Sequence, residues 1–398
     1  MTSVGSVAYI TKRIGEFSNL MTAGMEKNVR KHFREYLLGM MIPPEIRRKS
    51  ISNISSLVSE YDQSTLNRAI HAVDPETLEE NYIAFLKAMI GNHPVEFIGD
   101  DTILEHPGSK AMENVGWFYD HASGNNVLAH QPVTTMLHDI DSNEFYPFLV
   151  RMYVKKDNDS GENNNNFKTK LDIMANLFEI ASENFNVTGK VVDSWYSSFS
   201  FLGENYTTEL RSNRKASFQD LGKIGKKNRD MFYTMDEILE FTFLLYNNST
   251  GILKEFPLYR SFHIWLTNGK PANLVILYNP ENRRKKFLVS DHLEGDNIMV
   301  AWNHRWSIET FHNDAKDLGM GGYQVRDGEG SLIHVRITIA AYTILSRMIK
   351  ESEKLFGKFV KTIGECSRAI KEVLILKRTT NGDCLYGIKI RLDFTDIY

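Results

Sequence analysis

A row of aromatic and ionisable side chains lies between positions 302 and 316, in the stretch WNHRWSIETFHNDAK. Trp302, Arg305, Glu309, His312 and Lys316 follow one another at intervals of three and four residues. Side chains at this spacing lie on the same face of an α-helix. We therefore predict a single amphipathic helix that sets one carboxylate among cations. A solvated helix face with spaced Arg–Glu and Glu–Lys ion pairs is the simpler interpretation of the same row.

Two earlier aspartates lie where a metal site would need them. Asp100, followed by Asp101, lies in or just after an apolar run, and Asp193 ends the run KVVD. A carboxylate at the end of a buried strand is unfavourable unless it is paired or bound to a metal. With Glu309, these residues could supply the hard oxygen ligands that Mg²⁺ and Mn²⁺ prefer. Two such ions can activate a water or a 3′-hydroxyl and stabilise the leaving oxygen of a phosphodiester.

The segments around these carboxylates predict a mixed α/β sheet. Three β-rich runs over residues 95–104, 126–137 and 145–156 precede an amphipathic helix over 167–185, and GKVVDSWY then returns to a strand. Three strands, a helix and a further strand describe a mixed sheet with a crossover. A second stripe at Ile308, Phe311, Ala315 and Leu318 predicts the core side of the helix that carries Glu309.

The remaining segments complete the predicted organisation. Residues 9–90 are helical by pattern, with Asp74 before Pro75 as an N-cap and Gly91 as a C-terminal stop. The polar tract over 157–166 predicts a surface loop. The predicted parts are an α-helical N-terminal domain (1–92), a catalytic core in two pieces (93–204 and 301–355), a β-rich insertion (205–300) and a C-terminal region (356–398).

Composition and charge distribution favour a nucleic-acid partner. The chain has 398 residues, 42% of them hydrophobic and 24% charged, with a net charge of -3. Residues 1–50 nevertheless carry nine Lys and Arg against four Glu, and residues 211–230 carry seven against two Asp. Local basic segments on a nearly neutral chain are typical of nucleic-acid-binding proteins.

Several other classes of protein are excluded by missing patterns. Two cysteines, Cys366 and Cys384, form no disulfide framework and no cysteine-based zinc site. The sequence lacks HExxH, P-loop and GxSxG motifs. Since it also lacks a signal pattern and a continuous apolar run of about 18 residues, we expect a cytoplasmic protein with no membrane partner.

The order GDDT, VVDSWY, WNHRWSIETFHNDAK resembles that of the DDE transposases of prokaryotic insertion sequences. The similarity is greatest to the cut-and-paste branch related to insertion sequence 4, which carries a Tyr-x2-Arg-x3-Glu-x6-Lys signature. Arg305, Glu309 and Lys316 match that signature, and Trp302 stands in the Tyr position. The resemblance covers roughly residues 90–345, including VGWFYDHASGNNVLAHQPVT and LGMGGYQVRDGEG.

The resemblance implies a ribonuclease H-like fold and a catalytic role for the three carboxylates. Asp100, Asp193 and Glu309 would bind Mg²⁺ or Mn²⁺, as two ions, and Arg305 and Lys316 would hold DNA phosphates. The substrates would be the terminal inverted repeats of a transposon and a target DNA. Two ends held in one synaptic complex imply a homodimer, and the protein would be nucleoid-associated when bound to DNA.

Some assignments stay open at this stage. Adjacent strand residues point to opposite faces, so only one of Asp100 and Asp101 can join the metals, and we favour Asp100. Asp291 and Asp296 are weaker rivals of Glu309. Trp302 could contact DNA or pack in the core, and His312 is left out of the catalytic set. The basic segment with Arg211, Arg214 and Lys215 is predicted to contact the DNA backbone, and residues 1–50 to recognise the transposon end.

Two other functions fit the same residues. A ribonuclease H-like nuclease would cut DNA without joining it. A catalytically inactive DNA-binding protein derived from a transposase would bind DNA without cutting it. The intact carboxylate triad argues against the second alternative, because an inactive descendant would usually lose a carboxylate.

Overall fold

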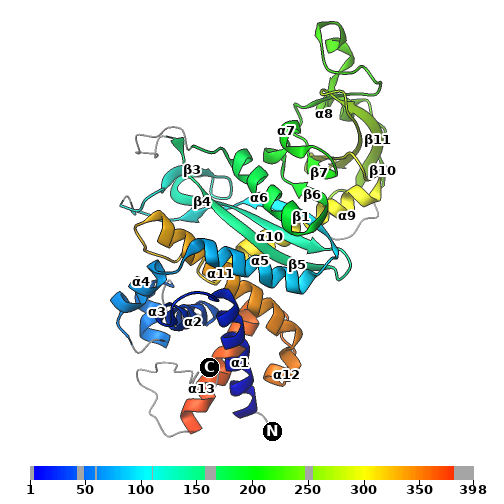
Figure 1. Ribbon diagram of the computed structural model, residues 1–398. Helices are drawn as coiled ribbons and strands as arrows, with labels where there is room; N and C mark the ends of the chain where they lie inside the picture. The colour runs from blue at the N-terminus through cyan, green and yellow to red at the C-terminus, as the bar shows by residue number, and fades with distance from the viewer. Residues whose placement is uncertain are drawn as a thin grey trace.

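The computed structural model describes residues 4–42, 49–58, 61–109, 111–156, 167–246 and 254–380. The predicted loop over 157–166 and the end of the predicted C-terminal region, 381–398, lie outside these residues. Figure 1 shows three levels: helices from both ends of the chain, a central sheet, and a β-rich part on the far side of that sheet.

The N-terminal part is helical, as predicted. Asp74 caps one of these helices, since its side chain accepts a hydrogen bond from the backbone N–H of Thr77 (2.7 Å). Pro75 follows in the first turn, and Gly91 ends the helix with a positive φ of 63°. The helices are α1 (Val4–Met21), α2 (Lys27–Met41), α3 (Ile51–Val58), α4 (Gln63–His71) and α5 (Pro75–Ile90).

The central sheet is built around β1 (Pro94–Asp101). This strand pairs antiparallel with β4 (Asn125–Asp139) and parallel with β6 (Asn186–Val192). The predicted β-rich runs correspond to the strands β1, β4, β5 (Glu144–Tyr153) and β6. The predicted mixed α/β class is therefore confirmed. Two further short strands pair with β4: β2 (Leu104–Glu105) and β3 (Gly116–Asp120).

The β-rich segment after residue 205 continues this sheet and does not stand apart from it. The strand β7 (Tyr206–Glu209) pairs parallel with β6, and β13 (Arg284–Ser290) pairs with β7. Within the described residues the result is one 13-stranded sheet. Its other members are β8 (Lys215–Ser217), β9 (Tyr233–Thr234), β10 (Leu245–Tyr246), β11 (Leu258–Leu266) and β12 (Pro271–Asn279), with η3 (Ser194–Tyr196), α7 (Phe199–Leu202), η4 (Lys226–Met231) and α8 (Met235–Glu240) between strands.

The helix predicted over residues 302–316 is two helices that meet at Arg305. α9 (Asp296–His304) ends just before this residue and α10 (Trp306–Asp317) begins just after it. The backbone N–H of Arg305 donates to Trp302 O (3.1 Å) and that of Ile308 donates to Arg305 O (3.2 Å). Because these bonds span three residues where an α-helix spans four, the regular ladder is interrupted and the two helices change direction.

Helices cover both faces of the sheet. α6 (Lys170–Asn184) packs on one face of β1, and α10 packs on the other, with its predicted core stripe buried. α11 (Gly328–Lys350) lies between the sheet and the terminal helices (Figure 1). In the described part of the chain, α11 alone is long and apolar enough to cross a membrane, but 67% of its most apolar stretch is buried inside the molecule. The chain then forms α12 (Ser352–Phe356) and α13 (Ile363–Thr380), which contacts α1, α10 and α11.

One buried lysine, Lys49, leads to a prediction of how the stability of the protein depends on pH. Lys49 is 4% exposed, its Nζ donates to the carbonyl oxygen of Met40, and its stem packs against Gly319. Burial lowers the pKa of Lys49 to about 7. An unfolded lysine titrates near about 10.4, so between these values the unfolded chain binds the extra proton. Lys49 therefore destabilises the fold fully below pH 7, and stability is recovered as the pH rises.

We expect the Lys49→Met variant to be more stable than the wild type at pH 7.5, with an advantage that shrinks by about 1 kcal/mol for each pH unit towards pH 9.5. The methionine fills similar space without a charge. Urea unfolding of both proteins at the two pH values measures this difference. An advantage that stays constant with pH would mean that Lys49 keeps its proton in the folded protein, as it does in the unfolded chain.

Candidate active site

Asp100 and Asp193 lie side by side on neighbouring parallel strands. Gly99 of β1 pairs with Val192 of β6, so each aspartate is the next residue along its strand. Neighbouring strands lie about 4.8 Å apart, which places the two carboxylates at one end of the same strand pair. Asp193 keeps an extended backbone (φ −68°, ψ 165°) before the η3 turn. The structure therefore brings together two residues that are far apart in the sequence.

Arg305 joins these strands to Glu309 of α10. Its Nη1 donates to Oδ2 of Asp100 (2.9 Å), and its Nη2 forms an ion pair with Oε1 of Glu309. The side chain of Arg305 is 14% exposed, against 16% for Asp100 and 29% for Glu309. Asp193 is also close enough for its charge to act on both Arg305 and Asp100. Two of the three predicted carboxylates thus contact one guanidinium, and the third, Asp193, lies near enough for its charge to act on it.

Asp101 faces the opposite side of the sheet and has its own partners. Its carboxylate accepts hydrogen bonds from Gln131 Nε2 (2.6 Å), Lys170 Nζ (2.9 Å) and Tyr196 Oη (2.7 Å). Alternation along β1 separates it from Asp100 although the two are adjacent in the chain. The contacts of Asp101 are those of a structural carboxylate that ties α6 and the η3 turn to β1.

The electrostatics of the cluster reflect an excess of negative charge. Burial raises the pKa of Asp100 to about 7, Arg305 opposes this change, and the carboxylates of Asp193 and Asp101 add to it. Burial would lower the pKa of Arg305, but Asp100, Glu309 and Asp193 together raise it. One arginine does not balance three carboxylates, so a second cation would be stabilised here.

The donor set suits a hard divalent cation. Asp100, Asp193 and Glu309 provide carboxylate oxygens from three separate segments of the chain. Mg²⁺ and Mn²⁺ prefer such oxygen ligands and are commonly held by one or two carboxylates together with substrate phosphates. The residues present therefore fit the predicted metal.

The other residues of the signature have different surroundings. Trp302 is only 3% exposed, and the guanidinium of Arg305 lies 5.0 Å from the centre of its ring. Of the two roles left open for Trp302, a DNA contact or packing in the core, its burial favours packing, and its ring supports Arg305. Its burial follows from its position in α9, whose inner face packs on β13, β7 and β6.

His312 is a core residue, although its spacing placed it on the polar row. It is 6% exposed, and its Nε2 lies 2.6 Å from Oγ1 of Thr134 on β4. Burial lowers the pKa of His312 to about 3, so the imidazole is neutral. The hydrogen bond fastens α10 to the strand that pairs with β1, because Thr134 lies opposite Asp100. Lys316, by contrast, is exposed and lies near the carboxylates of Asp120 and Glu105.

An exposed indole beside the site was not predicted. Trp195 follows Asp193 by two residues and is 53% exposed. The guanidinium of Arg211 and the ammonium of Lys170 each lie 5.2 Å from the centre of its ring. The sequence signal was the aromatic pair in VVDSWY, directly after the catalytic candidate, where an exposed ring can stack on a base. Of the predicted DNA contacts in the basic segment, Arg211 thus lies against the ring of Trp195, two residues after Asp193.

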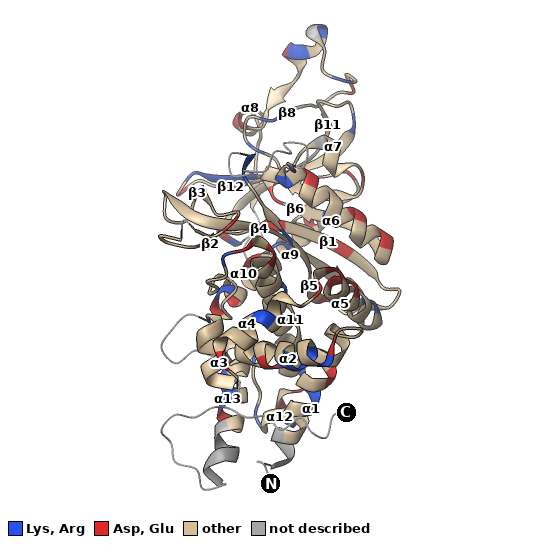
Figure 2. Ribbon diagram, turned by 60° about the vertical axis from the view of Figure 1, so that its left-hand side comes forward, with Lys and Arg blue, Asp and Glu red and all other residues tan. Residues whose placement is uncertain are grey.

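Arg214 and Lys215 lie further along the same segment. Arg214 precedes β8 and its carbonyl oxygen accepts from Met235 N, while Lys215 begins β8 and is near Glu237 of α8. In Figure 2, Lys and Arg mark several segments of the β-rich part around β8 and β12. The structure places both residues in that part.

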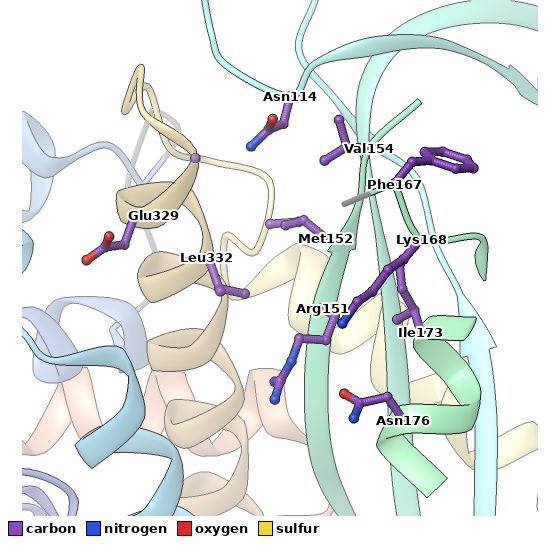
Figure 3. Close-up of a pocket in the computed structure, with 11 residues that line it drawn as sticks. Asn114, Arg151, Met152, Val154, Phe167, Lys168, Ile173, Asn176, Glu329 and Leu332 are labelled. Atoms are coloured by element: carbon purple, nitrogen blue, oxygen red, sulfur yellow. The ribbon is translucent and has the colours of Figure 1, made fainter. Parts of the chain in front are cut away.

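A pocket of about 490 Å³ lies at the edge of β5, apart from the carboxylates. Figure 3 shows it between β5, the beginning of α6 and the first turns of α11, with Asn114 above it and the side chain of Glu329 turned away. Arg151 and Lys168 supply positive charge, and Met152, Phe167 and Leu332 supply apolar surface. None of the three candidate catalytic residues lines this pocket, so it is a separate feature of the sheet edge.

Comparison with known proteins gives the family. No curated protein matches the sequence. A solved structure, the cryo-EM structure of a piggyBac transposase synaptic complex with hairpin DNA, is similar over 94% of this chain and 80% of that chain, with 12% identity and a TM-score of 0.46. The family model described as "Archaeal putative transposase ISC1217" matches residues 8–327, which include all three carboxylates and the whole of α10. The chain belongs to this archaeal transposase family.

Proposed function

We propose that this protein is a metal-dependent DDE transposase that cleaves DNA at transposon ends and joins the resulting 3′-hydroxyl to a target DNA. The observation that carries the proposal is the convergence of Asp100, Asp193 and Glu309 on one guanidinium, from three separate segments. Family membership supports transposition, and the carboxylate cluster supports the chemistry.

Each residue of the cluster has a role in this proposal. Asp100, Asp193 and Glu309 would hold one or two Mg²⁺ or Mn²⁺ ions, which would polarise the phosphodiester and activate the attacking oxygen. Arg305, supported by the ring of Trp302, offsets part of the negative charge of the carboxylates in the free protein and is placed to contact a phosphate at the same site. Its buried guanidinium is fixed from two sides, which suits precise positioning of a backbone phosphate.

The DNA would extend from this cluster across the exposed residues beside it. Trp195 can stack on an unpaired base while Arg211 contacts an adjacent phosphate. Lys316, Arg214, Lys215 and the basic residues of 1–50 are further candidates for backbone contacts. Terminal inverted repeats as the specific substrate, and a homodimer that holds two ends, remain predictions of the same proposal.

The fold and the branch of the family belong to the proposal as well. The order of β1, β4, β5, α6, β6 and β7, with α10 on the opposite face from α6, supports a ribonuclease H-like core. The match of Arg305, Glu309 and Lys316 supports a relation to insertion sequence 4. The predicted division into 1–92, 93–204, 205–300, 301–355 and 356–398 also stays a prediction.

The test is a cleavage and joining reaction on labelled DNA that carries the inverted repeats flanking the protein's own gene. We expect nicks at the repeat boundary and joined products with Mg²⁺ or Mn²⁺, and neither with a chelator. Nicks without joined products would favour the nuclease. Specific binding without cleavage in either metal would leave an inactive DNA-binding relative of a transposase.

Lys316 offers a test of the proposed DNA path. We expect Lys316→Ala to weaken binding to the transposon end and to reduce the slope of log K against log salt concentration by about 1, because one phosphate contact is lost. The measurement is a binding titration at several salt concentrations. Lys361→Ala, which removes an exposed lysine before α13, is the matched control and should leave the slope unchanged. Equal slopes for both variants would place Lys316 on a merely solvated face.

A further inference from the structure

Two histidines and a glutamate meet on the same face of β1 that carries Asp100. Glu96 and Asp100 are four residues apart on the strand, so their side chains point the same way. His138 lies directly opposite Glu96 on β4, and His304 is the last residue of α9. Their ligand atoms lie within 4.8 Å of one another. The group is distinct from the carboxylate cluster, about 13 Å away along β1 by strand rise.

The distances suit a tetrahedral metal ion. Oε2 of Glu96 lies 3.4 Å from Nδ1 of His138 and 2.7 Å from Nδ1 of His304. Ligand atoms about 2.0–2.1 Å from a tetrahedral zinc ion are about 3.4 Å apart, so the first distance already matches. The second distance is that of a hydrogen bond, and an outward movement of His304 by less than about 1 Å would open the site. The side chain of His304 is 24% exposed, so it has room to move and gives an ion access.

The contacts of His138 favour a cation between the three groups. Its Nε2 faces Oδ1 of Asn143 at 3.0 Å, while its Nδ1 faces the carboxylate of Glu96. A neutral imidazole has only one N–H, so it cannot donate to both oxygens. If Nε2–H donates to Asn143, Nδ1 presents a lone pair towards the carboxylate, and only a proton or a metal ion can join them. An outer partner that fixes the tautomer in this way is typical of histidine ligands.

Two of the three candidate ligands are also largely buried. His138 is 3% exposed, and the side chain of Glu96 is 12% exposed. Burial raises the pKa of Glu96, but the neighbouring His138 and His304 outweigh it and lower the pKa below the ordinary value. The carboxylate is therefore ionised and available as a ligand. Imidazole nitrogens with a carboxylate suit zinc and similar transition metals better than Mg²⁺.

We propose that Glu96, His138 and His304 form a transition-metal site of the zinc class, separate from the catalytic metals, with the fourth position of the ion open to water. The site would join β1, β4 and the end of α9, which lie together in Figure 1. His304 immediately precedes Arg305, so the ion would fix the junction of α9 and α10 over the strand that carries Asp100. The site is a positioning device for Arg305 and Glu309, and its existence does not depend on the proposed transposition chemistry.

The test is a measurement of zinc in untagged protein that has been stripped with a chelator, incubated with Zn²⁺ and dialysed. We expect about one zinc ion per chain by elemental analysis, a higher thermal midpoint with zinc, and a visible absorption spectrum of tetrahedral type when Co²⁺ replaces it. Mg²⁺ at the same concentration should not displace the zinc or the Co²⁺ from this site, because it does not compete for imidazole ligands.

Variants assign the ion to these residues. His304→Gln and Glu96→Gln should reduce the bound zinc from about one to near zero. His93→Gln is the matched control, because His93 is a nearby histidine that pairs with Asp139 outside the cluster, and it should retain the zinc. Glu309→Gln should retain it as well, which separates this site from the catalytic one.

A folded wild-type protein that retains no zinc after dialysis would overturn the proposal, whatever the variants do. So would equal zinc content in wild type and folded His304→Gln. If a variant fails to fold, the wild-type stoichiometry and the Co²⁺ spectrum still decide. Zinc binding together with failed DNA cleavage would contradict the proposed function and leave this site in place.

Discussion

The Asp100→Asn variant is expected to lose DNA strand cleavage by about 10³-fold or more, while Asp101→Asn loses less than about tenfold. Asp100 contacts Arg305 and lies beside Asp193, whereas Asp101 points to the other face and accepts from Gln131, Lys170 and Tyr196. An asparagine at 100 removes a charged metal ligand, which is worth several kcal/mol of transition-state stabilisation. An asparagine at 101 can still accept two of the three hydrogen bonds.

The two variants control for each other because they change the same group at adjacent positions. Cleavage of labelled transposon-end DNA at saturating Mg²⁺ measures the effect, and binding of the same DNA should remain in both variants. Glu309→Gln should match Asp100→Asn, since it removes another ligand of the set. Full activity of Asp100→Asn with an inactive, folded Asp101→Asn would move the metal site to the α6 face of the sheet.

Local patterns predicted the elements of the fold because they depend on near neighbours. Alternating and continuous apolar runs gave β1, β4, β5 and β6, and the pair Asp74–Pro75 gave the start of α5. The continuation of the sheet from β6 through β7 to β13 could not be predicted. Pairing between strands about 80 residues apart depends on tertiary packing, to which a local pattern does not respond.

Local patterns also failed to predict the surroundings of the residues in the candidate site. A strand-end position and a helical spacing select Asp193 and Glu309, but they do not say what surrounds them. The spacing of three and four residues continued through Arg305, so it could not show that the helix breaks there and that Trp302 turns into the core. His312 likewise has a polar side chain, yet Thr134 satisfies it inside the molecule.

The cluster of Glu96, His138 and His304 illustrates what sequence reasoning misses altogether. No two of these residues lie within 30 positions of one another, so spacing carries no signal. Only the antiparallel register of β1 and β4 places Glu96 opposite His138, and only the end of α9 adds His304. A one-residue shift in that register would point the histidine to the other face.

The Glu79→Ala variant is expected to destabilise the protein by about 3–5 kcal/mol. Glu79 of α5 accepts from Nη1 and Nη2 of Arg151 on β5 (2.6 Å each) and from Nη2 of Arg336 on α11. The side chains of Glu79 and Arg336 are only 14% and 12% exposed. Removing the carboxylate would leave two partly buried guanidinium groups without their shared partner, at the point where the N-terminal helices, the sheet and α11 meet.

Equilibrium unfolding in urea measures this loss, with Glu80→Ala as the matched control. Glu80 follows Glu79 on the same helix but is exposed, so its removal should change stability by less than about 0.5 kcal/mol. Glu79→Gln keeps the acceptor oxygen and removes the charge, so an intermediate loss is expected if the ion pairs matter beyond the hydrogen bonds. Equal stability of Glu79→Ala and Glu80→Ala would show that water replaces the carboxylate, and that apolar packing alone joins α5 and α11 to the sheet.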